Sequence, residues 1–192
     1  MVVSVLVYLS RGYVLDCASA LAAPALIDRV LDETGMTAEG HVLELHAGAS
    51  AVTKRVQRRL TTGTLKRESL TCGPGTACYP DAMFDLVISR DALHCIASQP
   101  RRLRIVRDAA RVLKPGGTLA VIDRDSVQHY ASLVEAVGLA VVGRRPESVM
   151  TLPRLDVLIA RRPMEPSVRN GLPIGHSEAE RTLDRLTLTL AL

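Results

Sequence analysis

The sequence is poor in aromatic residues, with no tryptophan, one phenylalanine and four tyrosines among 192 residues. Its apolar fraction of 47% must therefore come mainly from aliphatic side chains, so we expect a core of leucine, valine, alanine and isoleucine. An aromatic cage for a substrate is excluded for the same reason. The length suits one domain with a substantial core and is too short for two comfortable ones.

Cysteine is also scarce, and the four cysteines form no CxxC pair of the zinc-binding type. We predict no metal site. A cluster of Cys72, Cys78, His94 and Cys95 is the only candidate, and its spacing matches no known pattern. The cysteines are therefore expected to be reduced, buried small hydrophobes.

Long apolar runs are absent. The apolar stretch at residues 1–9 lacks a basic start and is shorter than the roughly 20 residues of a membrane span. We therefore predict a cytoplasmic protein without membrane association. The alternative is organelle targeting, since Arg11 precedes every acidic residue.

The net charge is +4, and the basic residues are mostly arginine. Four of them, Arg101, Arg104, Arg107 and Arg111, lie on one face of a predicted helix. We interpret this face as solvated surface, with nucleic acid or an acidic protein as the alternative partner.

A strand–turn–helix unit organises the first half of the chain. Val42 to Leu45 is a short apolar run typical of a buried strand. Small residues, 47–50, break it, and residues 51–60 carry apolar side chains at helical spacing. A helix over residues 25–35, ended by glycine, precedes the unit.

The second half continues the alternation of strands and helices. Phe84 to Ser89 is the clearest strand, followed by a helix from Pro100 to Leu113 that Ser98 caps. A turn at 114–117 leads to a strand at 118–122 and a helix at 126–137. Two final strands are expected at 139–142 and 155–160, and residues 64–71 suggest one more strand.

These units resemble the class I S-adenosylmethionine-dependent methyltransferases, of the kind called type 11. The resemblance rests on the turn after the first strand, on Tyr79-Pro-Asp-x-x-Phe-Asp-Leu-Val-Ile-Ser-x-Asp-x-Leu-His and on helix–Leu-Lys-Pro-Gly-Gly–strand. It implies an α/β fold with a Rossmann-like seven-stranded sheet over residues 25–162, in which strands 139–142 and 155–160 form the closing antiparallel pair. Residues 51–83 leave too little room for a full member, so we expect the sheet to be shortened around its second and third strands.

The chain outside this span is interpreted from composition. Residues 1–24 form an N-terminal extension, and residues 163–192 form a linker and tail. An amphipathic helix at 178–190 would pack on its own domain or on a protein partner.

In this family the cofactor-binding turn has the sequence pattern acid-x-Gly-x-Gly-x-Gly. The corresponding residues here are Glu44, His46, Gly48 and Ser50, so one glycine of three remains. By the resemblance, Glu44 and Gly48 bind the cofactor, whereas Ser50 is better explained as a helix cap. His46 either obstructs the methionine end of the cofactor or fills that space.

Other strand ends supply the remaining candidates. Glu68 is the sole acid available for the ribose hydroxyls, the alternative being a solvated charge at a strand edge. Ser89 is a further cofactor-binding candidate. Asp91 and His94 follow the family's fourth strand, where the resemblance places substrate-side or proton-handling residues, and a histidine can act as a general base near neutral pH. A surface-loop histidine is the alternative.

The resemblance implies S-adenosylmethionine-dependent methyl transfer to an unidentified acceptor. The alternative is a non-catalytic methyltransferase-like scaffold or regulatory subunit in which cofactor binding is lost. Methyl transfer depends chiefly on holding two reactants together. Cofactor binding is therefore the property that separates the two hypotheses.

Overall fold

The computed structural model describes residues 24–48, 50–70, 75–123, 127–147 and 155–164. Most of the predicted N-terminal extension, Cys72 and the predicted tail helix lie outside the described residues. In the part that the structure describes, no helix is long and apolar enough to cross a membrane.

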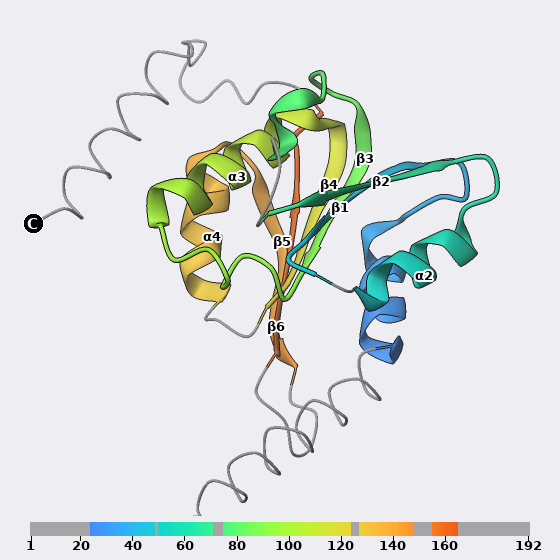
Figure 1. The fold of residues 1–192 in the computed structure, drawn as a ribbon, viewed down its shortest axis with the longest axis horizontal. Coiled ribbons are helices and arrows are strands. Elements are labelled where there is room, and N and C mark those ends of the chain that lie inside the picture. The colour runs from blue at the N-terminus through green and yellow to red at the C-terminus, as the bar shows by residue number, and fades with distance from the viewer. Residues whose placement is uncertain (1–23, 49, 71–74, 124–126, 148–154, 165–192) are drawn as a thin grey trace, which may run out of the picture.

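One mixed sheet forms the centre of the molecule (Figure 1). Its strands are β1 (His41–His46), β2 (Thr64–Ser69), β3 (Phe84–Arg90), β4 (Leu113–Asp123), β5 (Ala140–Glu147) and β6 (Leu155–Arg161). Their order is β2-β1-β3-β4-β6-β5. The first four strands are mutually parallel, and β6 runs antiparallel to both β4 and β5.

The predicted α/β fold is confirmed, with a sheet of six strands among the described residues instead of seven. β2 is the edge strand beside β1. The sheet is therefore one strand short at this edge, which is where the shortening was expected. The closing antiparallel pair is also confirmed.

Helices cover both faces of the sheet (Figure 1). The helix over residues 24–34 and α2 (Ala51–Arg59) pack on one face, while α3 (Gln99–Val112) and α4 (Val127–Ala136) pack on the other. The short 3-10 helix η1 (Gly75–Cys78) connects β2 to β3. Parallel strands require such crossovers, and a sheet covered on both faces explains why β1 and β3 are almost continuously buried.

Two predicted serine caps are present. The Ser50 hydroxyl accepts a hydrogen bond from the Val52 amide at 3.1 Å, and the Ser98 hydroxyl accepts one from Arg101 at 3.4 Å. Both serines have extended backbone angles, as residues at this position in a helix usually do.

The predicted turn at 114–117 lies inside β4, which is a correction to the expected strand start. Phe84 pairs with Leu113, but Leu86 pairs with Thr118, so the intervening residues of β4 bulge out of register. A Cβ on Gly117 would come within 2.8 Å of the Lys114 carbonyl oxygen, which explains the need for glycine there.

Asp85 ties this bulge to the start of β1. Its carboxylate accepts hydrogen bonds from the His41 amide at 2.8 Å and from Lys114 Nζ at 2.9 and 2.8 Å. Partial burial raises the pKa of Asp85, but the hydrogen bonds from His41 and Lys114 and the charge of Lys114 outweigh it. The pKa therefore lies below its usual value.

Asp85→Asn should lower the free energy of unfolding at pH 7 by about 0.5–1 kcal/mol, a small value because the Asp85 and Lys114 side chains are 43% and 37% exposed. A depressed folded-state pKa stabilises the fold above the unfolded-state pKa, and this contribution is lost as the pH falls through the folded-state pKa. Urea unfolding should therefore show the difference between wild type and variant narrowing from pH 7 to about pH 3. A difference that stays constant over that range contradicts the assignment.

Gly63 provides a test of how the turn between α2 and β2 packs against Glu39 and Gly40. A Cβ there would collide with the Gly40 carbonyl oxygen and approach Leu60 Cδ2 to 2.7 Å, whereas a Cβ on Gly48 would meet nothing within 4 Å. Gly63→Ala should therefore cost about 1–3 kcal/mol in chemical denaturation. The matched control Gly48→Ala should leave stability almost unchanged, and equal effects would show that the steric argument is wrong.

Candidate functional site

The predicted site residues gather at the carboxyl edge of the sheet. β1, β3 and β4 run parallel and end there with His46, Arg90 and Asp123. The connections that follow carry Gly48, Asp91 and His94. Ligands of open α/β sheets bind at this edge, beyond the carboxyl ends of the strands.

The turn after β1 is open. Gly48 is exposed, and the space that its Cβ would occupy has no neighbouring atom within 4 Å. Ser50 uses its hydroxyl to cap α2, which supports the capping role favoured from the sequence. The first amides of α2 therefore follow directly on an accessible turn, an arrangement that favours anions.

Glu44 lies on β1 and is only 1% exposed. One carboxylate oxygen, Oε2, accepts hydrogen bonds from Thr53 Oγ1 at 2.6 Å and from Arg67 Nε at 3.1 Å. The other oxygen, Oε1, is buried and has no partner among the described residues. Half of this carboxylate is therefore fixed by the fold, and the other half can still accept a hydrogen bond.

Three further buried polar atoms near the same edge lack partners within the described part of the chain. They are His46 Nδ1, at the end of β1, and Ser89 Oγ and Arg90 Nε, on β3. Glu44 and His46 share one face of β1, whereas Ser89 pairs with Leu45 and so faces the other side of the sheet. Native structures satisfy nearly all buried polar groups, so the two atoms on the face of Glu44 and His46 point to a ligand there. If the domain were a scaffold, His46 would be packed with both ring nitrogens hydrogen-bonded. Nδ1 of His46 has no hydrogen-bond partner in the described chain, so it does not fit that expectation.

Glu68 has a protein partner. It is half-buried on β2, and the Tyr79 side chain hydrogen-bonds to it. Burial raises the pKa of Tyr79, and the negative charge of Glu68 raises it further. The phenol thus stays protonated and donates to Glu68, so the interpretation of Glu68 as a solvated edge charge is corrected.

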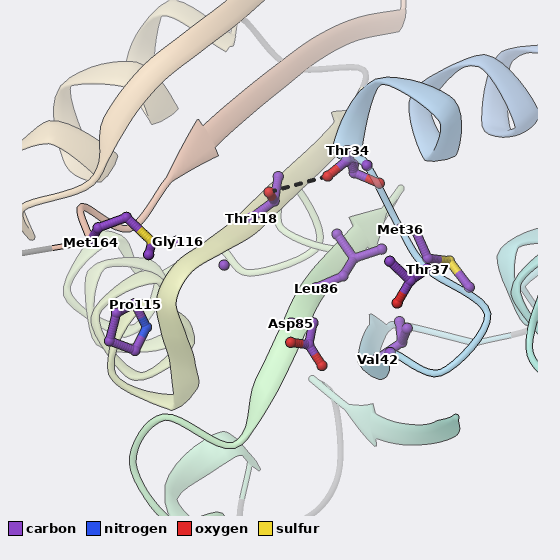
Figure 2. A pocket seen from close by; sticks show the side chains of 13 residues that line it. Thr34, Met36, Thr37, Val42, Asp85, Leu86, Pro115, Gly116, Thr118 and Met164 are labelled. Atoms are coloured by element: carbon purple, nitrogen blue, oxygen red, sulfur yellow. Dashed lines mark hydrogen bonds between the residues drawn. The ribbon is translucent and has the colours of Figure 1, made fainter. Parts of the chain in front are cut away.

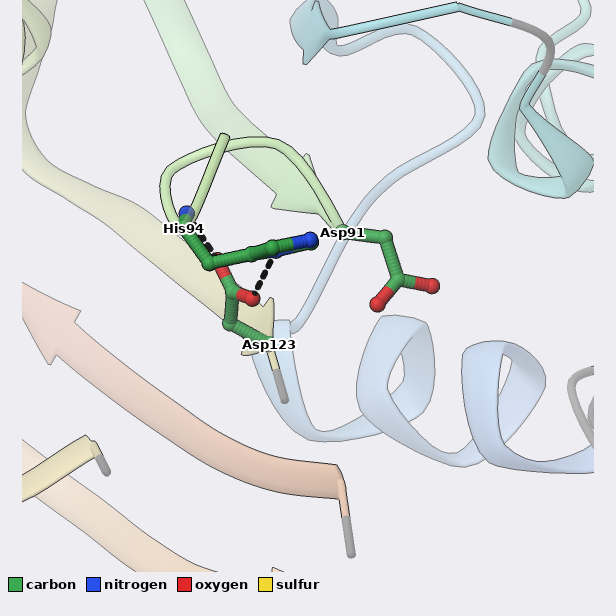
Figure 3. Close-up of side chains that lie close together, drawn as sticks. All are labelled: Asp91, His94 and Asp123. Carbon is green, nitrogen blue, oxygen red and sulfur yellow. Dashed lines mark hydrogen bonds and ion pairs between the residues drawn. The ribbon is translucent and has the colours of Figure 1, made fainter. Parts of the chain in front are cut away.

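His94 and Asp123 form a hydrogen-bonded dyad (Figure 3). The His94 amide donates to Asp123 Oδ2 at 3.1 Å, and His94 Nδ1 lies 2.5 Å from Asp123 Oδ1. Asp123 is fully buried, while the His94 side chain is 31% exposed. The dyad therefore joins an internal carboxylate to an imidazole that reaches the surface.

Asp123 was missed as a site residue in the sequence analysis. The available signal was its position directly after the buried run at 118–122, at the edge where the other candidates lie. A single acid after a strand does not identify its partner, which here is 29 residues away.

Asp91 lies at the entrance to the same loop. It has a positive φ of 49°, its amide donates to the Ile122 carbonyl at 2.9 Å, and its carboxylate pairs with Arg90 at 3.5 Å. In Figure 3 the Asp91 side chain lies beside the outer end of the His94 ring. Asp91 thus shapes the loop that carries His94.

One donor atom from each of Asp91, His94 and Asp123 lies within 4.8 Å of the others, a spacing that could hold a cation. The short His94–Asp123 hydrogen bond already accounts for the closeness of two of the three. We therefore assign the group to the dyad.

The cysteine prediction is wrong for two residues. Cys78 and Cys95 are exposed instead of buried. Cys95 lies beside the dyad, with Sγ 3.5 Å from His94 Nε2.

The arginine face of α3 is mostly exposed. Arg101, Arg104 and Arg107 are exposed and Arg111 is half-buried, as expected for a solvated surface. Two of the four also bond to backbone carbonyls. Arg101 donates to Leu70 at 2.8 Å, and Arg111 donates to Tyr79 and Thr76 at 2.9 and 3.1 Å.

A separate cavity of about 270 Å³ lies at the opposite, amino edge of the sheet (Figure 2). Thr34, Asp85 and Met164 are among its lining residues, and Thr118 Oγ1 donates to the Thr34 carbonyl across it at 3.4 Å. It shares no residue with the candidates at the carboxyl edge.

Comparison with known proteins identifies relatives. The family described as methyltransferase domain matches residues 17–121, more than half of the chain. The 27-O-demethylrifamycin SV methyltransferase of Amycolatopsis mediterranei is 37% identical over 89 residues, which are 46% of this chain and 32% of that protein. The probable tRNA methyltransferase 9B of Homo sapiens is 35% identical over 54 residues, 28% of this chain and 12% of that protein. The matches thus span about a third and about an eighth of these relatives.

Solved structures share the fold at low identity. The [4+2]-cyclase SpnF superposes with a TM-score of 0.63 and 16% identity, covering 76% of this chain and 83% of that one. The 1,6-didemethyltoxoflavin-N1-methyltransferase of Burkholderia thailandensis superposes with a TM-score of 0.59 and 14% identity, covering 71% and 76%. At these identities the likeness shows the architecture alone. Together with the family match over residues 17–121, it shows that the chain belongs to the methyltransferase domain family, in the class I S-adenosylmethionine-dependent group that its motifs resemble.

Proposed function

We propose that this domain binds S-adenosylmethionine at the carboxyl edge of its sheet and transfers the methyl group to an acceptor hydroxyl. The observation that carries the proposal is the open turn at Gly48 together with two buried polar atoms on the same face of β1 that lack partners in the described chain. These are Glu44 Oε1 and His46 Nδ1.

The cofactor's functional groups fit these atoms. The methionine end of S-adenosylmethionine carries a carboxylate and an ammonium group. The amides at the start of α2 and His46 Nδ1 suit the carboxylate, and Glu44 Oε1 suits the ammonium. When bound, the cofactor supplies an electrophilic methyl group on a sulfonium.

The dyad supports a hydroxyl as the acceptor. A hydroxyl must lose its proton when its oxygen is methylated, so a positioned base assists the reaction. Asp123 holds His94 through Nδ1, which leaves Nε2 to accept that proton. Asp91 remains a candidate contact for the acceptor. The relative from Amycolatopsis is, by its name, also a methyltransferase that acts at an oxygen.

A non-catalytic scaffold is the second hypothesis. It is favoured by the loss of two glycines from the turn and by Tyr79 hydrogen-bonding to Glu68, the only local candidate for the ribose hydroxyls. The two hypotheses differ in cofactor binding, which can be measured without knowing the acceptor.

S-adenosylhomocysteine, the demethylated cofactor, should raise the melting temperature of the full chain, because a ligand that binds only the native state stabilises it by about 2.7 kcal/mol at 100 times Kd. Gly48→Val should remove the shift with little change in the unliganded melting temperature, since a Cβ at Gly48 has no atom within 4 Å beyond its chain neighbours. His94→Gln should keep the shift, as its proposed role is in proton transfer.

The matched control is Ala140→Val, at an exposed position on β5, which should retain the full shift. Titration calorimetry at millimolar ligand that gives no heat with the wild-type protein would reject cofactor binding and favour the scaffold.

His46→Gly distinguishes obstruction from contact. Because Nδ1 is buried and has no partner in the described chain, we expect it to hydrogen-bond the charged methionine end. Removing such a bond should weaken S-adenosylhomocysteine binding about tenfold or more in calorimetry. The unliganded variant should lose little stability, as no hydrogen bond of this nitrogen within the described chain is broken. Unchanged or tighter binding would mean that the ring obstructs the site.

A further inference from the structure

Beyond methyl transfer, we infer that Cys95 is a covalent modification site, a reactive thiol activated by the His94–Asp123 dyad. Cys95 Sγ lies 3.5 Å from His94 Nε2, and His94 Nδ1 lies 2.5 Å from Asp123 Oδ1. The three residues therefore form a chain of nucleophile, base and orienting carboxylate, the arrangement that activates thiols and hydroxyls in covalent catalysis.

The surrounding loop fixes this geometry. Ala92, Leu93 and Ile96 are buried and hold the loop against the core, while Cys95 is exposed between them. The Cys95 amide donates to the Ala92 carbonyl at 3.3 Å, and the Ile96 amide donates to the Leu93 carbonyl at 3.1 Å. The thiol is thus presented to solvent from an anchored turn.

Asp123 determines which ring nitrogen can act as the base. Its carboxylate accepts from both the amide and Nδ1 of His94, and it is completely buried, so water does not compete for it. With the ring hydrogen on Nδ1, Nε2 can accept from Cys95, whose Sγ lies 3.5 Å from it and 3.8 Å from its other acceptor, the Asp91 carbonyl oxygen. The thiol can therefore transfer its proton to Nε2.

The reaction partner we assign is a low-molecular-weight disulfide. The Cys95 proton moves to His94 Nε2, and the thiolate attacks one sulfur of the disulfide. A Cys95–sulfur bond forms as the disulfide bond breaks, and the departing thiolate takes the proton from His94. Electrons balance, since the incoming disulfide is the oxidant and the released thiol is its reduced half.

Modification would also regulate the proposed site, a consequence that rests on the proposed function. Nε2 of His94 is the atom that would accept the proton of an acceptor hydroxyl. A substituent on Cys95, 3.5 Å away, would occupy the approach to it. The reactivity of the thiol itself does not depend on methyl transfer.

The test is exposure of the native protein to oxidised glutathione, followed over time by peptide mass spectrometry. Cys78 in the same molecule is the reference, because it is also exposed but has the phenol of Tyr79 beside it, which is an acid and not a base. Cys95 should react roughly tenfold faster than Cys78 or more. In urea-unfolded protein the two rates should become equal.

Variants assign the effect to the dyad. His94→Gln and Asp123→Asn should each bring the Cys95 rate down towards that of Cys78. The matched control His41→Gln changes a partly buried histidine on β1 outside the dyad and should leave the rate unchanged. Circular dichroism establishes that each variant is folded.

Two results would overturn the inference. One is that Cys95 in the native wild-type protein reacts with oxidised glutathione no faster than Cys78 does. This measurement needs no variant. The other is a fast rate that survives in folded His94→Gln. Neither result bears on S-adenosylhomocysteine binding, so failure here is distinguishable from failure of the proposed function.

Discussion

The parallel arrangement of β1, β2, β3 and β4 is the constraint on which the rest of the structure depends. Parallel neighbours cannot be joined by tight hairpins, so each connection crosses a face of the sheet, and helices cover both faces. The same constraint brings every carboxyl strand end to one edge. His46, His94 and Asp123 are far apart in the sequence. They lie at the same edge because parallel strands place their carboxyl ends together.

Most of the fold could be predicted because its signals are local. The buried runs of β1 and β3 and the serine caps of α2 and α3 each follow from a few adjacent residues, whereas the antiparallel pairing of β5 with β6 was expected from the family resemblance. The bulge in β4 could not be read in this way. The Lys-Pro-Gly-Gly stretch predicts a turn, but whether that turn ends a strand or bulges within it depends on pairing with β3.

The candidate site was predictable in its location and less so in its contacts. Ser50 was assigned correctly to the helix cap because capping is a local interaction. The partners of His94 and Glu68 were missed, because Asp123 and Tyr79 reach them only through the folded sheet. The exposure of Cys95 was missed for a related reason. Its neighbours Ala92, Leu93 and Ile96 occupy the buried positions of the loop, which leaves the cysteine outside.

Buried polar atoms without partners at the carboxyl edge of the sheet lower the stability of the unliganded domain. A buried polar atom without a partner costs about 1–3 kcal/mol, and Glu44 Oε1 and His46 Nδ1 both lack a partner within the described chain. A polar ligand at this edge would offset the cost by supplying the missing partners.

The dyad introduces a competition at one atom. Nε2 of a neutral imidazole has a single lone pair, so it can accept a proton from Cys95 or from an acceptor hydroxyl, but not from both at once. Asp123 stabilises the charged ring in either case, because its buried carboxylate is held to Nδ1 and to the His94 amide. Whichever donor lies nearer to Nε2 therefore determines the chemistry of this edge, and an acceptor must displace the thiol before His94 can act on it.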